Sequence, residues 1–369
     1  MKILHIVPDM YTGGAQKFCI DLCNELVKNR DLDITICSVE KLTDGQQIMY
    51  KKIHPDIKFI SLDKEGKSPL IMFKIVKMLF SLKPDITHTH LRAQMFSALG
   101  LLLLRRPNIH TIHTVAHNET TKGRMKFYGF LYDYFNFTPV SISEQVLKTT
   151  QALYGQKHNV MIDNGGEKVQ KTDEYEETKK FIDSIKRDKS SKVFVSLGRL
   201  YNVKNQELLI NAFEELIEEG FDVNLLILGS LITVPSYAKM CQEMIKSPDR
   251  IHILGEKGNV PDYLYLCDAL CFSSIYEGFP MAIIEAMSIG IPTVSTPVGG
   301  IPDVVKDGTI GYLSKDMSVE SYKDALKRVI LNDEIDKDEL IAHYEKHYTV
   351  EQCASKYLSL YQEKLSLKR

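Results

Sequence analysis

Residues Ala269–Met287 read ALCFSSIYEGFPMAIIEAM, which predicts a strand, a loop and a helix in succession. Apolar β-forming residues predict a strand that ends near Ser273, Gly278 permits a turn, and Pro280 suits the first position of a helix. The backbone at Phe279–Met281 would then offer an anion site at the start of that helix. Such a unit is typical of parallel α/β sheets, which bind ligands at the carboxyl ends of their strands.

Two carboxylates lie in this stretch. Glu277 is on the loop, and Glu285 lies about one and a half turns into the predicted helix, where a charged residue is a poor core residue unless it is paired. At this spacing the two carboxylates could bind hydroxyls of a ribose and a donor hexose on either side of a diphosphate. A capping Glu and a surface Glu are the structural alternative.

Similar units repeat along the chain and predict parallel sheets with crossover helices. In the first half the predicted strands are Lys2–Val7, Asp33–Ser38, Ile57–Leu62, Asp85–Thr89, Asn108–His113, Thr138–Ile142 and Asn159–Asp163. In the second half they are Lys192–Leu197, Asn224–Leu228, Arg250–Leu254, Ala269–Ser273, Pro292–Ser295 and Ile310–Leu313. We therefore expect an α/β protein with two Rossmann-like sheets.

The polar segment Glu167–Ser191 interrupts the alternation and predicts a linker or surface excursion between domains. We expect one domain over residues 1–165 and a second over residues 166–348. After Asp316 only helices are predicted. The last of these, Thr349–Lys364 within residues 349–369, would have Thr349 as its N-cap.

The composition excludes several classes of protein. With 369 residues, 44% of them hydrophobic and 25% charged, the chain is suited to two folded domains and not to intrinsic disorder. Its longest apolar run, Ala93–Leu104, is too short to span a bilayer, and its first nine residues do not form a secretory signal. Seven cysteines without zinc-binding spacing are expected to be buried thiols. These features predict a cytoplasmic protein.

The net charge of −2 is unevenly distributed. Residues 1–165 hold 21 Lys+Arg and 15 Asp+Glu, a balance of +6, whereas residues 166–369 hold 25 and 33, a balance of −8. This asymmetry suggests that the halves face different partners, and ordinary solvated surfaces are the alternative.

Three further loops contain residues that packing alone does not require. Gly13-Gly14 precedes the first helix and would let a ligand approach the backbone, although a tight turn explains the pair equally well. Arg199 and Lys204 lie at a strand-to-helix turn and could both reach one diphosphate, or they could be a solvated pair. A second glycine pair, Gly299-Gly300, could support the same phosphate pocket or only shape a turn.

Together these motifs resemble glycosyltransferase family 4, the retaining enzymes of the GT-B fold. The resemblance rests on GGAQ from Gly13, SLGRLYNVK at Ser196–Lys204, the spacing of Glu277 and Glu285, and TPVGGIPDVVKDGTIGYL at Thr296–Leu313. It implies two facing Rossmann-like domains, with the acceptor held mainly by the first and the nucleotide-sugar by the second. It also implies that a C-terminal helix crosses back to the first domain.

The resemblance implies four catalytic residues. Arg199 and Lys204 would neutralise the donor diphosphate as the glycosidic bond breaks. Glu277 would orient the transferred sugar, and His113 would contact it, although a histidine at the end of a strand is otherwise as often structural. No metal is expected, because the basic pair replaces it and no carboxylate cluster is placed for one. No carboxylate suits the role of covalent nucleophile, so a front-face displacement fits the residues better.

The implied donor-binding residues lie in the same loops. Glu285 would bind the ribose, the backbone near Gly255 and Glu256 would contact the base, and Gly13 and Gly14 would let the first domain close over the diphosphate. Four residues that follow Glu277 complete the set: Gly278, Phe279, Pro280 and Met281. Departures from the family pattern at 164–167 and 228–230 leave UDP and GDP both open.

The predicted function is transfer of a hexosyl-type residue from a nucleotide-diphosphate sugar to a saccharide or lipid-linked saccharide acceptor, with retention. The resemblance places this reaction in bacterial envelope, lipopolysaccharide, exopolysaccharide or capsule synthesis. A nucleotide-sugar epimerase or hydrolase on the same fold is the alternative, and a non-catalytic sugar-binding protein is a third interpretation. A dehydrogenase is disfavoured because the dinucleotide fingerprint is missing.

One basic, apolar helix could meet a membrane. The segment Ser68–Phe80 would suit anionic lipid headgroups, and so would the cations Lys122, Arg124 and Lys126, which follow the His113 strand beside aromatic residues. These elements predict peripheral contact with the inner face of the plasma membrane. Ordinary core packing of the helix is the alternative. No nucleic acid partner is expected.

Overall fold

The computed structural model describes all residues except 65, 67–69, 120, 332–334 and 367–369, and it divides into two compact units. Unit 1 consists of Met1–Gly166 and Tyr348–Arg369, and unit 2 consists of Glu167–His347. The expected domain boundaries each lie one residue from these divisions.

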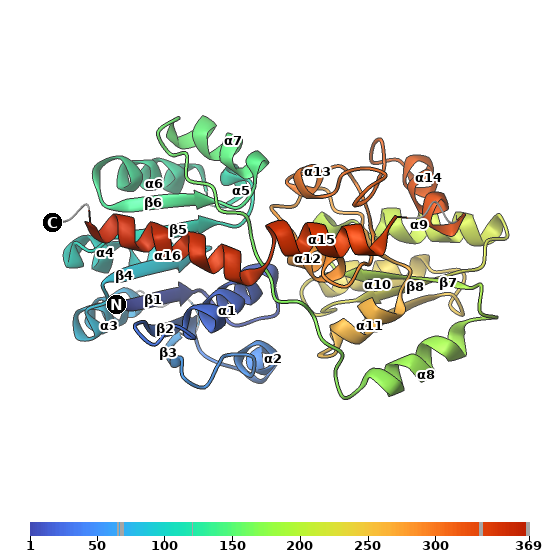
Figure 1. Ribbon diagram of the computed structural model, residues 1–369, viewed down its shortest axis with the longest axis horizontal. Helices are drawn as coiled ribbons and strands as arrows, with labels where there is room; N and C mark the ends of the chain where they lie inside the picture. Colours follow the sequence, from blue (N-terminus) through green and yellow to red (C-terminus); the bar gives the residue numbers. More distant parts are fainter. Residues whose placement is uncertain (65, 67–69, 120, 332–334, 367–369) are drawn as a thin grey trace. The chain divides into compact units, whose positions relative to one another are not determined.

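Unit 1 contains a six-stranded parallel sheet with the order β3-β2-β1-β4-β5-β6 (Figure 1). Its strands are β1 (Lys2–Val7), β2 (Asp33–Glu40), β3 (Lys58–Lys64), β4 (Ile86–His90), β5 (Asn108–Ile112) and β6 (Phe137–Ser141). Its helices are α1 (Gly14–Leu26), η1 (Asp44–Gln46), α2 (Gln47–Tyr50), α3 (Leu70–Leu82), α4 (Ala93–Leu104), α5 (Ala116–Glu119), α6 (Lys122–Tyr134), α7 (Glu144–Tyr154) and α16 (Val350–Ser366). The strand order reverses between β1 and β4, and such a switch point is where doubly wound sheets bind ligands.

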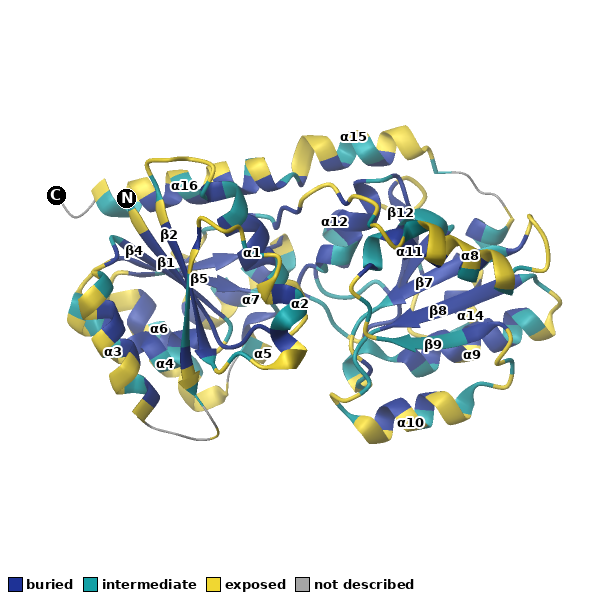
Figure 2. Ribbon diagram, turned by 90° about the horizontal axis from the view of Figure 1, so that it is seen from below, coloured by how far each residue is buried: buried dark blue, intermediate teal, exposed yellow. Residues whose placement is uncertain are grey.

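Helices cover both faces of this sheet, so its strands are buried (Figure 2). α3, α4 and α6 lie on one face, and α1 packs against the C-terminal helix α16 on the other. Thr349 caps α16, since its Oγ1 accepts a hydrogen bond from the amide of Gln352 at 3.4 Å. The hydroxyls of Tyr357 and Tyr361 on α16 are buried and hydrogen-bonded to the strands. The C-terminal helix is therefore part of the core of unit 1.

Unit 2 repeats the same topology with the order β12-β11-β10-β7-β8-β9. Its strands are β7 (Lys192–Leu197), β8 (Val223–Leu228), β9 (Ile251–Gly255), β10 (Ala269–Phe272), β11 (Thr293–Ser295) and β12 (Gly311–Leu313). Its helices are α8 (Tyr175–Ile185), η2 (Asn202–Lys204), α9 (Gln206–Glu218), α10 (Pro235–Met244), α11 (Val260–Leu266), α12 (Met281–Met287), α13 (Ile301–Val304), α14 (Val319–Ile330) and α15 (Lys337–His347). Its switch point lies between β7 and β10, which pair directly.

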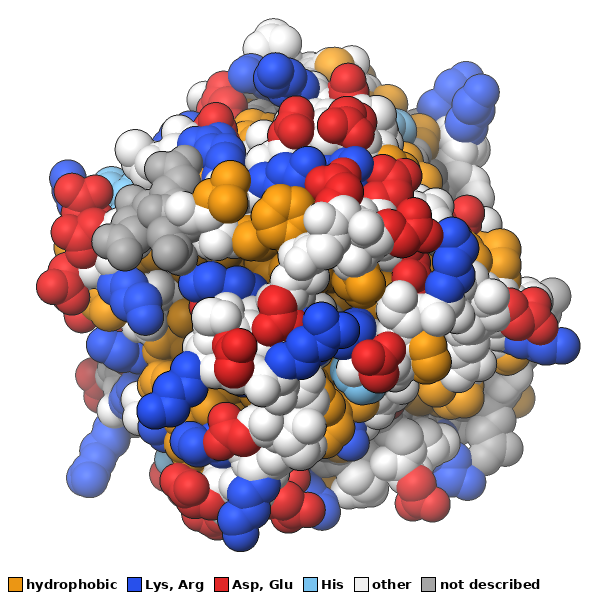
Figure 3. All heavy atoms as spheres, turned by 90° about the vertical axis from the view of Figure 1, so that its right-hand side faces the viewer, with side chains coloured by type: hydrophobic (Ala, Val, Ile, Leu, Met, Phe, Trp, Pro, Cys, Tyr) orange, Lys and Arg blue, Asp and Glu red, His pale blue; other side chains and the backbone are white. Residues whose placement is uncertain are grey.

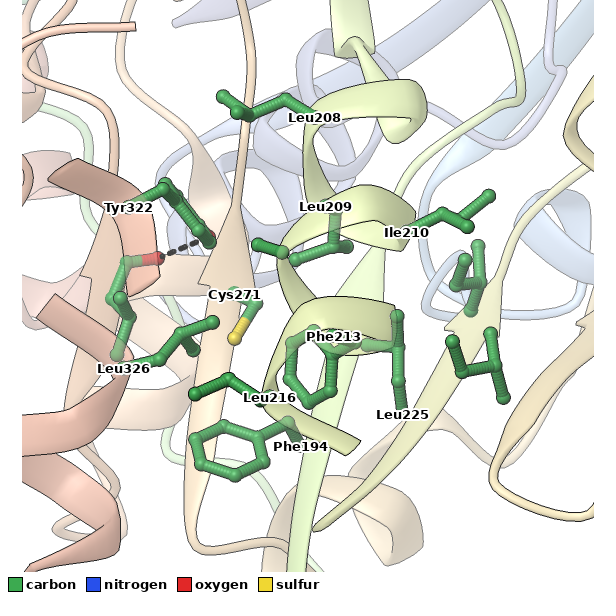
Figure 4. Packing of buried hydrophobic residues seen from close by; sticks show 14 of the residues in the cluster. Phe194, Leu208, Leu209, Ile210, Phe213, Leu216, Leu225, Cys271, Tyr322 and Leu326 are labelled. Atoms are coloured by element: carbon green, nitrogen blue, oxygen red, sulfur yellow. Dashed lines mark hydrogen bonds between the residues drawn. The ribbon is translucent and has the colours of Figure 1, made fainter. Parts of the chain in front are cut away.

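Helices α9 and α14 supply much of the core of unit 2. Figure 4 shows Phe213 and Leu216 of α9 packed near Phe194 of β7, and burial of each such side chain contributes roughly 1.5–3 kcal/mol. Tyr322 of α14 is also buried, and its hydroxyl donates to the carbonyl oxygen of Phe272 at 3.0 Å. This bond satisfies a polar group that would otherwise be costly inside an apolar core.

Two expectations about local structure were wrong. Asn159–Asp163 forms one isolated bridge to Ser141 and not a strand, because only one residue of this segment pairs with β6. Pro280 is not the first residue of a helix, because it has a ψ of 120° and is the N-cap residue before α12. The polar segment Glu167–Ser191 contains the helix α8, whose Thr178 and Ile182 form a narrow buried stripe.

The described cysteines are buried, and the surface carries charges of both signs. All seven cysteines lie among the described residues, where each is buried and has a free thiol. Figure 3 shows acidic and basic side chains interspersed on one face of the molecule. In unit 2, for example, the ammonium of Lys323 lies within 3.1 Å of carboxylates of Glu215, Glu219 and Glu320. No described helix is both long enough and apolar enough to cross a membrane.

Candidate functional site

An ion pair joins the two strands at the switch point of unit 2. Lys204 follows β7 and Glu277 follows β10, and the Nζ–Oε1 distance between them is 2.5 Å. The hydroxyl of Ser274 donates to the same carboxylate oxygen at 2.6 Å. The two charged side chains are only 20% and 12% exposed, so solvent screens them weakly.

Backbone contacts hold the loops of this pair together. The amide of Ile275 donates to the carbonyl oxygen of Val203 at 2.8 Å, and the hydroxyl of Ser273 donates to that of Lys204 at 2.9 Å. Gly198 has a φ of +153°, and a Cβ there would lie 3.2 Å from Cε of Lys204. The glycine of the LGR sequence therefore leaves room for the lysine side chain.

Arg199 is exposed and does not join the ion pair. Its guanidinium carbon lies 5.8 Å from the ring centroid of Tyr201, and its carbonyl oxygen accepts from Nε2 of Gln206 at 3.2 Å. Among the described residues its guanidinium has no ion-pair partner. The guanidinium is thus accessible to an anionic ligand.

The loop with Gly299 and Gly300 supports the loop with Glu277. Gly299 has a φ of +56°, and a Cβ there would lie 1.7 Å from the carbonyl oxygen of Glu277. The amide of Gly300 donates to the carbonyl oxygen of Gly278 at 3.1 Å, and Oγ1 of Thr296 donates to that of Ser274 at 2.7 Å. The glycine pair therefore lets the backbone approach Glu277 closely.

The remaining predicted residues of unit 2 lie around these loops. Phe279 and Met281 are buried at the start of α12, and Glu285 lies in the same helix with 9% of its surface exposed. Gly255 ends β9, which β8 separates from β7, and Glu256 next to it is exposed. The structure thus brings Gly278–Met281 to the ion pair and leaves Gly255 and Glu256 two strands away.

The predicted residues of unit 1 follow β1 and β5, and β4 lies between these two strands. Gly13 is the N-cap of α1, and Gly14 is its first residue. In the preceding loop, Asp9 accepts a hydrogen bond from Nε2 of Gln16 at 2.8 Å and lies 3.4 Å from the guanidinium of Arg92. His113 follows β5 directly, one residue beyond the end of the strand.

One group of metal-ligand side chains occurs among the described residues. His5, Cys19 and His90 of unit 1 are buried, with ligand-type atoms within 4.8 Å of one another. The described loops of unit 2 hold no comparable group. The expectation that donor binding needs no metal stays a prediction.

Sequence analysis missed Ser274 and Thr296. Both lie next to a predicted strand end and hold the Glu277 loop through side-chain oxygens. A hydroxyl residue three positions before a loop carboxylate was the available signal for Ser274. Thr296 had no such signal, since its partner lies 22 residues earlier in the chain.

Comparison with known proteins now adds to this geometry. A family model described as Glycosyl transferases group 1 matches residues 177–347, and one described as Glycosyltransferase Family 4 matches residues 12–165. Over 350 residues the chain is 25% identical to UDP-Gal:alpha-D-GlcNAc-diphosphoundecaprenol alpha-1,3-galactosyltransferase of Escherichia coli, covering 89% of this chain and 88% of that protein. It is also 25% identical to the capsular polysaccharide biosynthesis glycosyltransferase CapH of Staphylococcus aureus, covering 87% of this chain and 86% of CapH.

A solved structure shares the fold. Anabaena Alr3699/HepE in complex with UDP and glucose matches 98% of this chain and 100% of its own, with a TM-score of 0.81 and 18% sequence identity. The relatives named here are glycosyltransferases, and the comparisons do not support an epimerase or hydrolase. With two family models that together cover most of its length, the chain belongs to glycosyltransferase family 4 and has the GT-B fold.

Proposed function

We propose that this glycosyltransferase moves a hexosyl residue from a nucleoside-diphosphate sugar to a saccharide or lipid-linked saccharide acceptor, with retention and without a metal ion. The observation that carries the proposal is the Lys204–Glu277 ion pair at the switch point of unit 2. The name of the Escherichia coli relative specifies a UDP-sugar donor and a diphosphoundecaprenol-linked acceptor, which supports the same chemical classes here.

The reaction needs positive charge where the leaving diphosphate forms. The ammonium of Lys204 and the accessible guanidinium of Arg199 supply it, and fixed charges in a partly buried site stabilise a developing anion strongly. When the diphosphate binds the ammonium of Lys204 in place of Glu277, the Glu277 carboxylate keeps its hydrogen bond from Ser274. It can then accept hydrogen bonds from sugar hydroxyls. The leaving phosphate oxygen receives the acceptor proton as the new glycosidic bond forms on the same face.

Glu285 completes the proposed donor site of unit 2, and the glycines Gly13 and Gly14 belong to unit 1. A buried carboxylate about one turn into α12 suits the paired hydroxyls of a ribose, which are good donors to a charged acceptor. Gly13 and Gly14 add no side chain of their own at the start of α1, so a phosphate could approach its amides.

A transfer assay tests the proposal directly. Purified protein is incubated with UDP- or GDP-sugars and undecaprenyl-diphosphate-linked saccharides, after thermal-shift screening has identified the donor that raises the melting temperature. We expect an α-linked product from an α-linked donor, with the same rate in excess EDTA. Inversion, loss of activity in EDTA, or release of free sugar without an acceptor would each contradict a part of the proposal.

We also propose that unit 1 contacts an anionic membrane through α3, α4 and α6. These helices share one face of the sheet, and the core explains only part of their apolar surface, since Phe73 and Tyr134 are 70% and 75% exposed. The other exposed apolar side chains on them are Leu70, Phe80, Leu99, Leu103, Phe127 and Phe130. Exposed cations lie beside them at Lys74, Lys77, Lys122, Arg124 and Lys126. Ser68 and Pro69 of the predicted segment lie outside the described residues.

Vesicle flotation checks this contact. The protein should float with phosphatidylglycerol vesicles and not with neutral phosphatidylcholine vesicles, because both apolar and cationic groups contribute. Phe73→Asp should lower the bound fraction severalfold. Ile232→Asp is the matched control, because Ile232 of unit 2 is an 82% exposed apolar residue and should not affect flotation. Absence of wild-type binding to anionic vesicles would refute the contact.

A further inference from the structure

A buried histidine chain leads to His113 from the core of unit 1. Nε2 of His113 lies 3.0 Å from Nδ1 of His90, and Nδ1 of His5 lies 3.1 Å from Nε2 of His90. The chain ends at Cys19, whose sulfur lies 3.8 Å from the same Nδ1 of His5. His5 and His90 come from β1 and β4, the strands at the switch point, and both are fully buried.

The ring of His90, at the centre of this chain, is neutral. Burial, with smaller effects from neighbouring histidines, holds the pKa of His90 well below its usual range. Burial is the main cause that lowers the pKa of His113 to about 3, and the charge of a protonated His110 is a smaller one. A neutral imidazole has one N–H donor and one acceptor nitrogen, so the hydrogen bonds between these rings must all run in one direction.

The inner end of the chain determines that direction. Nε2 of His5 is buried and has no hydrogen-bond partner in the part of the chain that the structure describes, while Nδ1 of His5 meets both His90 and Cys19. If His5 carries its hydrogen on Nδ1, this N–H can be shared between Nε2 of His90 and the sulfur of Cys19. Nε2 of His5 then has only an unpartnered lone pair. The opposite direction would leave a buried N–H unpartnered, which is rare in proteins, and would give one lone pair two donors.

We propose that His90 and His5 are positioning residues that hold His113 in the tautomer with hydrogen on Nδ1 and aim that donor at a hydroxyl of the transferred sugar. The inference rests on the proposed transferase activity and on the sugar contact that the family resemblance implies for His113. Donation runs from His5 through His90 to Nε2 of His113, so His113 keeps its proton on Nδ1. That nitrogen has no hydrogen-bond partner among the described residues, and the side chain is partly exposed.

Nitrogen-15 NMR of histidine-labelled, ligand-free protein tests the tautomer without any turnover. His113→Gln identifies the His113 signals. We expect a protonated Nδ1 and an unprotonated Nε2 in the wild type, and loss of this preference in His90→Leu. A protonated Nε2 in the wild type, or an unchanged spectrum in His90→Leu, would overturn the proposal. One bound zinc per protein molecule in elemental analysis would also overturn the proposal, because a metal would occupy the lone pairs that accept the hydrogen bonds between the histidines.

Kinetics separates positioning from a structural role. His90→Leu should lower kcat by about tenfold or more with little change in KM for the donor, because the donor hydrogen bond counts most in the transition state. His90→Asn places an amide donor near the position of Nδ1 and should restore most of kcat. His158→Gln is the control, because His158 is a buried histidine of unit 1 that is hydrogen-bonded to Asp133 and does not belong to the histidine chain. Equal kcat in His90→Leu and wild type would overturn the proposal, whereas an inactive wild type with the expected tautomer would instead count against the proposed function.

Discussion

Replacing Lys204 by Ala is expected to lower kcat/KM for sugar transfer by about 10²–10³, and Glu277→Ala should have an effect of similar size. Lys204→Ala removes the partly buried cation that would meet the leaving diphosphate. Glu277→Ala removes the carboxylate that would orient the sugar and frees Lys204 from its partner at 2.5 Å. Steady-state kinetics with the donor and acceptor of the wild type measures both effects, and circular dichroism checks that the fold is intact.

Lys192→Ala is the matched control for this prediction. Lys192 is the first residue of β7, at the opposite end of the strand that leads to Lys204, and its ammonium lies 3.3 Å from Asp268. Lys192→Ala therefore removes another lysine–carboxylate ion pair from the same sheet. Normal transfer in Lys192→Ala together with loss in Lys204→Ala would assign the effect to the position. Near-normal turnover in either Lys204→Ala or Glu277→Ala would refute the site.

Much of the fold follows from local sequence signals. Twelve of the thirteen predicted strands occur, with ends that shift by a residue or two, because buried parallel strands are short apolar runs between glycine- or proline-containing turns. Asn159–Asp163 has the same local pattern, but strand formation needs a partner edge over several residues, and only one bridge forms there. The helix α8 shows the opposite case, since two buried side chains suffice to hold a mostly polar helix on the surface.

The candidate site was only partly predictable for a related reason. Lys204 and Glu277 were identified by their positions after strands, but their direct pairing depends on β7 and β10 being neighbours at the switch point. The histidine chain of unit 1 had no sequence signal, because His5 and His90 occur in strands 85 residues apart and look like ordinary inward-facing positions. Contacts between distant strands emerge only once the order of the sheet is known.

Gly299→Ala should have the second large effect, on both stability and transfer. Its Cβ would lie 1.7 Å from the carbonyl oxygen of Glu277, in a backbone conformation with a φ of +56°. Neither atom belongs to a flexible side chain, so the Glu277 loop itself must move, and transfer should fall by about a hundredfold or more. Gly220→Ala controls for strain alone, since its φ is +91° and nothing lies within 4 Å of the added Cβ.

The comparison of the two alanine variants distinguishes steric displacement from backbone strain. Gly220→Ala should lower the free energy of unfolding by about 1–2 kcal/mol, the usual cost of a left-handed conformation, and leave kcat/KM unchanged. Gly299→Ala should lower the melting temperature further and should also weaken donor binding, because Glu277 and the amides of α12 move together with their loop. Thermal unfolding and donor titration measure these two quantities. If both variants lose the same small amount of stability and both retain transfer, then the close approach of Gly299 does not position Glu277. The loop with Gly299 and Gly300 would then only connect β11 to α13.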